Sequence, residues 1–478
     1  MSIEAILIFF FILGYAMIAL EHTLKIDKTA PALLSGMTMW AVFAVAAIYF
    51  GYVPEAAAEA IAHGGDHGGH GGGHAAGGSH ATMAYIEAQL THHLFEISNI
   101  LFFLLGAMTI VETIDIHDGF AVITSKIKTT NKVKLLWILT ILTFFLSAIL
   151  DNLTTSIVMA SLVTKMISEK KLRLLYAGAI VIAANAGGAW SPIGDVTTTM
   201  LWIKGQISVI PIVVWLIIPS LVCMIIPTFV LSKSSDMKGT FERLPLTTKF
   251  KTTPFERIFV LSLGVGCLLF VPVFKTVTHL QPFMGMLFGV GLLWQVTDFM
   301  HKKKSHEEKT DLSVTKALAK IDAPSVLFFL GILSAVACLQ SVGVLGGVAV
   351  WLRDTIGNFD AIVLVIGVLS AIVDNVPLVA ASQGMYEVTT PEMLAAAANP
   401  AETAYLTTFL PDGKFWQFLA YCAGTGGSIL IIGSAAGVAV MGIEKIDFIW
   451  YMKRFGWLAF IGYIAGAIVY LVQFQIFA

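Results

Sequence analysis

A series of long apolar runs constrains the fold of this chain more than any other feature. A bilayer has a hydrocarbon core about 30 Å thick, which takes about 20 helical residues to cross. With 57% hydrophobic and only 13% charged residues, the chain carries more apolar surface than a soluble domain buries. We therefore expect an all-α polytopic membrane protein. The runs lie at about residues 3–20, 31–53, 94–112, 135–164, 174–203, 207–232, 257–271, 283–300, 324–342, 359–382, 415–443 and 455–476.

Two of these runs predict re-entrant hairpins instead of complete spans. A straight helix from Lys134 to Lys165 would be about 45 Å long, which exceeds the thickness of the hydrocarbon. If this run turns back halfway, the basic residues on both of its flanks stay on one side. The run at 359–382 is treated as the matching hairpin from the other face. Inner loops then hold 25 of the 29 Lys and Arg residues, which favours about ten spans plus two hairpins, with both termini outside.

The two predicted hairpins carry the same motif. Residues 147–152 read SAILDN and residues 370–375 read SAIVDN, 223 residues later. A second match places NAGGAWSPIG at 185–194 over GTGGSILIIG at 424–433, with a displacement of 239 residues. The first unit begins with a span that runs inwards and the second with one that runs outwards, so we expect inverted repeats. The glycines predict a broken transmembrane helix in each repeat, although close packing of small residues is an alternative.

These assignments predict five parts of the chain. They are two N-terminal transmembrane helices in 1–53, a His/Gly-rich outer loop in 54–93, a first inverted repeat in 94–232 with its hairpin near 134–165 and its broken helix near 174–203, connecting spans and inner basic loops in 233–323, and a second inverted repeat in 324–478 with its hairpin near 359–382 and its broken helix near 415–443.

Three carboxylates, Asp151, Asp195 and Asp374, are predicted to lie within the membrane, where a charge costs about 2.5–3.5 kcal/mol at the centre of a helix. Burial favours the protonated carboxyl and a bound cation favours the ionised one, so a single group can hold either in competition. The amides of Asn152 and Asn375 offer hard oxygen ligands, and we expect Na⁺ at these two Asp-Asn pairs. An alternative is that each aspartate caps a half-helix or forms a pair within the bundle. Nearby hydroxyls belong to Thr154, Thr155, Thr197, Thr198 and Thr199.

In full, the repeated motifs read SAILDNLTT, NAGGAWSPIGDVTTTMLW, SAIVDNVPLVAAS and GTGGSILIIGSAAG. They resemble the motifs of NhaD-type sodium/proton antiporters of the ion transporter superfamily, over about residues 94–478. The resemblance implies two inverted units and a homodimer. Dicarboxylate carriers of the same superfamily typically have Ser-Asn-Thr at the hairpin tips, so the Asp-Asn pairs favour a cation as substrate. One departure is Ser434, which stands opposite Asp195, so we do not expect equal ligand sets from the two halves.

Carried over by motif, the resemblance implies ion or proton binding by Asp151, Asn152, Asn185, Asp195, Thr197, Thr198, Ser370, Asp374, Asn375 and Ser428. Thr154 and Ser147, in the first of these motifs, complete the candidate set.

Histidines gather in and after the predicted outer loop. His92 and His93, with Glu96, begin the third predicted span and are candidates for pH sensing. The preceding tract is rich in glycine and alanine. We interpret it mainly as a solvated, nonessential linker, and the alternatives are loose binding of a soft divalent metal or a change of charge at about pH 6.5. Its histidines are His63, His67, His70, His74 and His80.

Together these features predict a secondary active transporter that exchanges cytoplasmic Na⁺ or Li⁺ for external H⁺ by alternating access, in sodium and pH homeostasis and salt tolerance. The alternative is a sodium-coupled dicarboxylate, citrate or arsenite carrier of the same superfamily. A membrane enzyme is disfavoured because the sequence has no cofactor fingerprint. We expect an integral protein of a bacterial inner membrane with no cofactor, and the net charge of −2 gives no reason to expect a nucleic-acid partner.

Overall fold

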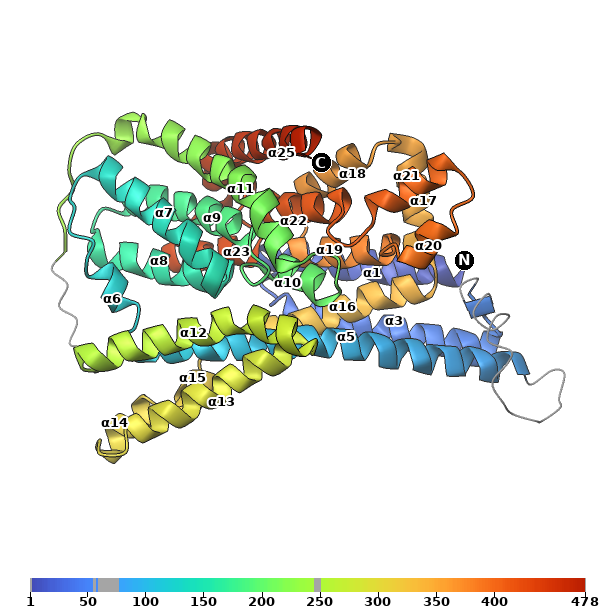
Figure 1. Ribbon diagram of the computed structural model, residues 1–478, viewed down its shortest axis with the longest axis horizontal. Helices are drawn as coiled ribbons and strands as arrows, with labels where there is room; N and C mark the ends of the chain where they lie inside the picture. The colour runs from blue at the N-terminus through green and yellow to red at the C-terminus, as the bar shows by residue number, and fades with distance from the viewer. Residues whose placement is uncertain (1, 55–56, 59–76, 245–250, 478) are drawn as a thin grey trace. The chain divides into compact units, whose positions relative to one another are not determined.

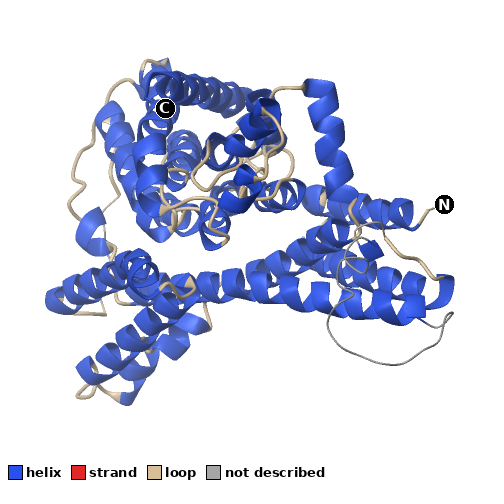
Figure 2. Ribbon diagram, turned by 45° about the vertical axis from the view of Figure 1, so that its right-hand side comes forward, coloured by secondary structure: helices blue, strands red, loops and turns tan. Residues whose placement is uncertain are grey.

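The structure, a computed structural model, describes residues 2–54, 57–58, 77–244 and 251–477. The described residues form helices joined by loops and contain no strand (Figure 2). In hydrocarbon every backbone N–H and C=O group needs a partner within the protein, and a helix supplies these partners within one segment. Eight of the described helices are long and apolar enough to cross a membrane. The prediction of an all-α polytopic membrane protein is therefore confirmed.

The smaller of two compact units comprises Met1–Leu101, Asp322–Asn358 and Ala380–Glu387. Glycines allow its helices to approach closely, because Gly36 on α3 faces the backbone of Gly331 on α16. The indole of Trp40 on α3 donates a hydrogen bond to the Ser334 carbonyl on α16 at 2.9 Å. The helices of this unit are α1 (Ile3–Ala19), α2 (Glu21–Leu24), α3 (Thr29–Phe50), the first part of α5 (Gly77–Ile116), α16 (Ala323–Ser341), α17 (Val344–Ile356) and the last part of α19 (Asn375–Met385).

Helix α5 is longer than the apolar run that predicted it at 94–112. It begins at Gly77, so residues 77–93, which we expected in the outer loop, are helical. Within this part, residues 81–90 contain three alanines and one each of methionine, glutamate, glutamine and leucine, which are strong helix formers, and no proline. Hydropathy alone does not detect such a polar extension. His63, His67, His70 and His74 of the predicted linker lie outside the described residues, as does the side chain of His80.

The larger unit comprises Phe102–Ile321, Phe359–Val379 and Val388–Ala478 and contains both Asp-Asn pairs and both glycine-rich motifs. Its helices can be followed by their labels in Figure 1. In addition to the remaining parts of α5 and α19, its helices are α6 (Ala121–Thr124), α7 (Lys132–Leu150), α8 (Asn152–Met166), α9 (Lys170–Gly188), α10 (Val196–Ile203), α11 (Val209–Ser232), α12 (Pro254–Thr278), α13 (Pro282–Met300), α14 (His306–Asp311), α15 (Val314–Leu318), α18 (Phe359–Leu369), α20 (Pro391–Ala395), α21 (Pro400–Thr408), α22 (Lys414–Gly426), α23 (Ala435–Glu444), α24 (Phe448–Tyr451) and α25 (Trp457–Phe477), with a 3₁₀ turn at Ser235–Met237 and a π-helical turn at Met452–Gly456.

Helical structure is interrupted at the four places where we expected a turn or a break. The Asp-Asn motifs separate α7 from α8 and α18 from α19, and the glycine-rich motifs separate α9 from α10 and α22 from α23. Asp151 alone separates α7 from α8, with a φ of 82°, a value that non-glycine residues rarely adopt. Each interruption leaves the N-terminus of a helix inside the larger unit.

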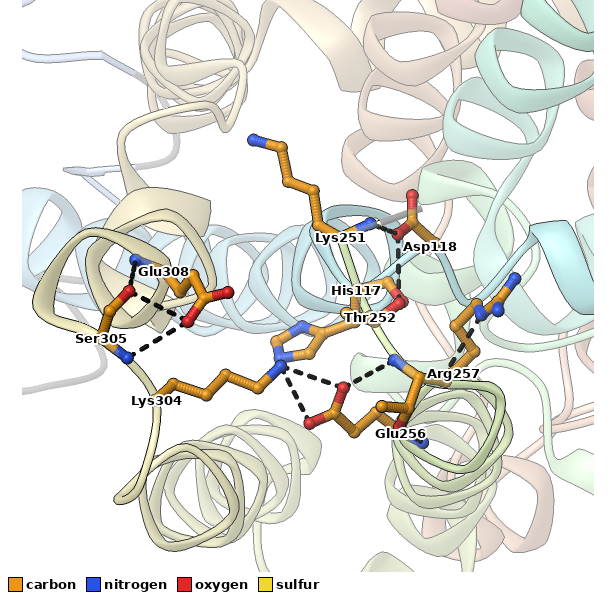
Figure 3. Close-up of polar contacts among 10 residues, drawn as sticks. His117, Asp118, Lys251, Thr252, Glu256, Arg257, Lys304, Ser305 and Glu308 are labelled. Atoms are coloured by element: carbon orange, nitrogen blue, oxygen red, sulfur yellow. Dashed lines mark hydrogen bonds and ion pairs between the residues drawn. The ribbon is translucent and has the colours of Figure 1, made fainter. Parts of the chain in front are cut away.

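Two buried histidines stack at the ends of α5 and α13. The rings of His117 and His301, which directly follow these helices, have centroids 5.0 Å apart and an interplanar angle of 16°. Neither Nε2 atom has a hydrogen-bond partner within the described part of the chain. Nearby, Lys304 forms an ion pair with Glu256 at 2.9 Å (Figure 3). Burial lowers the pKa of His117, and it lowers the pKa of His301 to about 4.

This pair predicts that acid weakens the packing of these helix ends. A histidine with a lowered pKa stays neutral in the folded protein while the unfolded chain is protonated below pH 6.5. Stability is therefore complete above about pH 6.5 and falls as the pH drops towards 4. We expect a loss on the order of 2 kcal/mol at pH 5, measured by hydrogen exchange around residues 297–305. His301→Phe, which keeps a flat ring, should show a smaller dependence on pH. Equal dependence in both proteins would contradict the assignment.

Candidate ion-binding site

The serines of the two Asp-Asn motifs make equivalent contacts with the glycine-rich helices. Ser147 on α7 donates a hydrogen bond to the Ala184 carbonyl on α9 at 2.6 Å. Ser370, directly after α18, donates to the Ala423 carbonyl on α22 at 3.1 Å. The serines are 223 residues apart and the alanines 239 residues apart, which are the displacements of the sequence motifs. The repeat in sequence is thus also a repeat in packing.

Glycines allow the same helices to cross at close range in both halves. A methyl group at Gly187 on α9 would overlap the carbonyl oxygen of Phe144 on α7. A methyl group at Gly426 on α22 would overlap the carbonyl oxygen of Gly367 on α18. Phe144 and Gly367 are again 223 residues apart, and the glycines facing them are 239 residues apart. These contacts bring the Asp-Asn turns against the breaks in the glycine-rich helices.

Asp195 is the centre of a buried hydrogen-bond cluster in the larger unit. It caps α10, where its Oδ1 accepts hydrogen bonds from the backbone nitrogen and the hydroxyl of Thr197 at 2.9 and 2.8 Å. Its Oδ2 accepts hydrogen bonds from the amide nitrogens of Asn152 at 2.5 Å and Asn375 at 3.5 Å. Since these asparagines occupy equivalent positions of the two Asp-Asn motifs, the motifs meet at one carboxylate oxygen.

These contacts stabilise the ionised form of Asp195. An ionised carboxylate offers about four lone-pair positions, and the four hydrogen bonds from Thr197, Asn152 and Asn375 occupy them. The positive end of the α10 dipole adds a favourable interaction. A buried charge without such partners would cost several kcal/mol. Asp195 therefore caps a half-helix, α10, as one alternative proposed, and the same carboxylate is also the centre of the cluster.

Asn185 extends the cluster to the second glycine-rich motif. Its side-chain oxygen accepts a hydrogen bond from Asn152 at 3.1 Å, and its amide nitrogen donates to the hydroxyls of Ser428 and Ser434, each at 2.9 Å. Ser434 caps α23, as Asp195 caps α10. We had noted Ser434 only as the residue opposite Asp195 and had not included it among the candidates. Its place in the alignment of the two repeats was the signal that could have identified it.

Asp151 and Asp374 lie beside this cluster, each next to one of its asparagines. Asp151 caps α8 and accepts hydrogen bonds from the backbone nitrogen and the hydroxyl of Thr154, both at 2.8 Å. Asp374 accepts a hydrogen bond from the backbone nitrogen of Val376 at 3.3 Å. Each carboxylate directly precedes a helix, α8 or α19, and the first residue of that helix, Asn152 or Asn375, belongs to the cluster. The larger unit thus gathers three acidic side chains and three amides around interrupted helices.

Comparison with known proteins shows similarity to membrane transporters. The family described as Citrate transporter matches residues 15–409. The chain is 44% identical to Sodium/proton antiporter 1 of Arabidopsis thaliana over 96% of this chain and 70% of that protein. It is 40% identical to Sodium/proton antiporter 2 of the same plant, over 96% and 97%. It is 30% identical to the Na⁺/H⁺ antiporter NhaD of Vibrio cholerae, over 97% and 90%.

The chain belongs to the NhaD-type sodium/proton antiporter family. This confirms the resemblance seen in the motifs, and it confirms that the protein is a transporter and not an enzyme. Together with the apolar helices, membership of this antiporter family establishes an integral membrane protein.

In this member of the antiporter family, some of the hydroxyl side chains in the motifs form hydrogen bonds with backbone carbonyls and not with the side chains of the cluster. The hydroxyls of Ser147 and Ser370 are used to hold helices together, as described above. Thr198 donates its hydroxyl to the backbone carbonyl of Asp195 at 2.9 Å. Thr199 donates to the Pro192 carbonyl at 3.0 Å. These four hydroxyls therefore donate their protons to backbone carbonyls, which positions the turns and helix ends around the cluster.

Two polar ties between the halves were not anticipated from the sequence. Buried Glu444, at the end of α23, accepts hydrogen bonds from Arg173 near the start of α9 and from Thr164 on α8, at 3.0 and 2.5 Å. Asp412, before α22, accepts two hydrogen bonds from Ser208, in the loop that follows α10 and directly before α11, both at 2.6 Å. In each tie, the start of one broken helix is bound to the end of the other. Such ties fix the crossing of the four half-helices.

His92 and His93 lie on the part of α5 that belongs to the smaller unit of this antiporter family member. Each has a ring nitrogen 3.6 Å from a carboxylate oxygen of Glu96. His92 is exposed, whereas His93 is buried and has its ring 6.5 Å from that of Trp40. The pH-sensing role that we assigned to these histidines stays a prediction.

Proposed function

We propose that this protein exchanges cytoplasmic Na⁺ or Li⁺ for external H⁺ by alternating access, with the cluster around Asp195 as the shared site. One observation carries the proposal: amides from both Asp-Asn motifs converge on a single buried carboxylate. A site built from both halves of a repeat can respond when the halves move. The names of the relatives support Na⁺ and H⁺ as the exchanged ions.

The residues present can exchange a proton for a cation without changing the fold. Na⁺ takes oxygen ligands, and carboxylates, amide oxygens and hydroxyls are the oxygen donors of this cluster. Rotation of the Asn152 or Asn375 side chain would present its oxygen to a cation in place of its nitrogen. A proton on Asp195, Asp151 or Asp374 would remove a negative charge and disfavour the cation. The assigned ligands of Na⁺ are Asp151, Asn152, Asp374 and Asn375, with Asp195, Asn185, Thr197, Thr154 and Ser428 in support.

The charge of the cluster favours a cation over a dicarboxylate or citrate. The described hydrogen-bond partners of Asp151 and Asp195 are amides, hydroxyls and backbone nitrogens, none of which carries a positive charge. Carriers of carboxylates require donors or positive charge to offset the charge of the substrate. Three carboxylates at one place would repel such a substrate. The citrate description of the matching family therefore does not determine the substrate.

A transport measurement tests this function. Everted membrane vesicles that contain the protein are acidified inside by respiration, and NaCl, LiCl, KCl or citrate is then added while the internal pH is followed. We expect proton release with NaCl or LiCl and none with citrate. Citrate uptake that depends on sodium, without sodium-driven proton movement, would identify the alternative carrier.

We also infer an inverted-repeat topology, in which 94–232 and 324–478 are the two repeats and 134–165 and 359–382 are re-entrant hairpins. The support is the recurrence of the Ser147 and Gly187 contacts at Ser370 and Gly426. The five-part division, both termini outside, a homodimer and location in a bacterial inner membrane complete the proposal. Crosslinking in native membranes tests the homodimer.

Cysteine labelling tests the hairpin near 134–165. A cysteine in 165–173 is expected to react from the same side of the membrane as one in 113–134, because the chain between them enters and leaves on one face. The native cysteines are buried and give a low background. Labelling of the two positions from opposite sides would show a complete span and remove the basis for the inversion.

A further inference from the structure

Three potential metal ligands converge on α5, in the smaller unit. The Nε2 atom of His92 lies 3.6 Å from Oε1 of Glu96, and Nδ1 of His93 lies 3.6 Å from Oε2. One ligand atom from each of the three residues can be chosen so that all three atoms lie within 4.8 Å of one another. Glu96 lies four residues after His92 and three after His93, and these spacings place both rings beside the same carboxylate on an α-helix.

The spacing of these atoms fits a small divalent metal ion. Ligands bound to zinc at 2.0–2.2 Å in tetrahedral geometry are about 3.3 Å apart. The separations of 3.6 Å between Glu96 and each histidine are close to this value, and side-chain rotations would bring both imidazoles and the carboxylate onto one ion. Two imidazoles and one carboxylate leave a fourth position for water. Imidazole suits zinc and its neighbours in the first transition row and does not suit Na⁺.

One ligand is held firmly while the others remain accessible. The side chain of His93 is only 5% exposed and lies against Trp40, whose indole is fixed by its hydrogen bond to Ser334. The side chains of His92 and Glu96 are 63% and 26% exposed. The apolar part of α5 after residue 94 is long enough to cross the hydrocarbon, so these ligands lie at the edge of the apolar run. A hydrated metal ion can therefore reach them.

We propose that His92, His93 and Glu96 form a binding site for Zn²⁺ or a similar divalent transition metal. The site is separate in chemistry from the Asp195 cluster, which offers oxygen ligands in the larger unit. It also does not depend on the histidines at 63–80. Bound metal would join positions 92, 93 and 96 of α5 and would stiffen this turn of the helix.

The test measures metal binding by purified full-length protein in which the five histidines at 63–80 are replaced by glutamine. Zn²⁺ affinity is measured by competition with a chromophoric chelator. Co²⁺ provides a second probe, because its visible absorption reports tetrahedral coordination. We expect one Zn²⁺ ion per chain in this protein. His92→Gln and Glu96→Gln should each lower the affinity at least about tenfold and remove the tetrahedral Co²⁺ spectrum.

His306→Gln is the matched control, because His306 is an exposed histidine on α14. It should leave the affinity and the Co²⁺ spectrum unchanged. His92 and Glu96 are preferred to His93 for substitution because they are more exposed, and equal unfolding temperatures without metal would show that the variants fold. Unchanged Zn²⁺ affinity in His92→Gln and Glu96→Gln would overturn the proposal. Loss of all binding when the histidines at 63–80 are replaced would also overturn it, by assigning the metal to that tract.

Discussion

Asp195→Asn is expected to abolish sodium-dependent proton movement. The amide cannot take up a proton at working pH. Whichever way it turns, its NH₂ group faces donors, either the two from Thr197 or the two from Asn152 and Asn375. An unpaired buried donor costs about 1–3 kcal/mol, so the unfolding temperature should fall as well. Proton flux in everted vesicles and thermal unfolding in detergent measure the two effects separately.

Asp151→Asn separates loss of charge from loss of structure. Asparagine is nearly as good a helix cap as aspartate, so the bond to the Thr154 backbone can persist and the protein should fold normally. We expect exchange to be abolished all the same. Asp354→Asn is the control, because Asp354 is 65% exposed and pairs with its neighbour Arg353. Full exchange by folded Asp195→Asn or Asp151→Asn protein would show that the residue is only a cap.

Gly187→Ala and Gly426→Ala are each expected to destabilise the larger unit and stop transport. The added methyl group would overlap the carbonyl oxygen of Phe144 or Gly367, and a backbone atom cannot rotate away. Overpacking typically costs 1–3 kcal/mol, and we expect a loss of about this size or more at either crossing. Thermal unfolding of the purified variants measures the loss, and vesicle assays measure exchange.

A glycine without neighbours provides the matched control for these substitutions. Gly291 lies within α13, and a methyl group there would meet no atom within 4 Å. Gly291→Ala should be neutral or stabilising by up to about 1 kcal/mol, because alanine favours the helix. If Gly187→Ala and Gly426→Ala behaved like Gly291→Ala, the close crossing of α7 with α9 and of α18 with α22 would be wrong.

The positions of the helix interruptions could be predicted because their signals are local. A run that is too long for one span predicted a turn within 135–164, and the glycines predicted an interruption within 174–203, where α9 ends at Gly188. The start of α5 was missed because its first turns are polar, and hydropathy finds only helices that contact lipid or a core. Helix propensity was the available signal there.

The composition of the Asp195 cluster was only partly predictable. The sequence indicated which acidic and amide residues lie in apolar surroundings, but it did not indicate that Asp195 lies between the two Asp-Asn motifs. Nor did it indicate that Ser434 contacts Asn185 or that Glu444 pairs with Arg173. The contact of Asp195 with Asn152 joins residues 43 positions apart, whereas the other contacts join residues at least 180 positions apart, and the pairing depends on how the half-helices cross.

The sequence by itself determined that this chain spans a membrane, that it repeats two motifs and that Asp151, Asp195 and Asp374 lie at helix interruptions. Hydrophobicity, glycine content and charge act over neighbouring residues, so they can be read along the chain. Only the tertiary structure decided that Asn152 and Asn375 share the carboxylate of Asp195. Hydrogen bonds act only over short distances, and the close glycine crossings of α7 with α9 and of α18 with α22 bring the amide nitrogens of Asn152 and Asn375 to 2.5 and 3.5 Å from Oδ2 of Asp195.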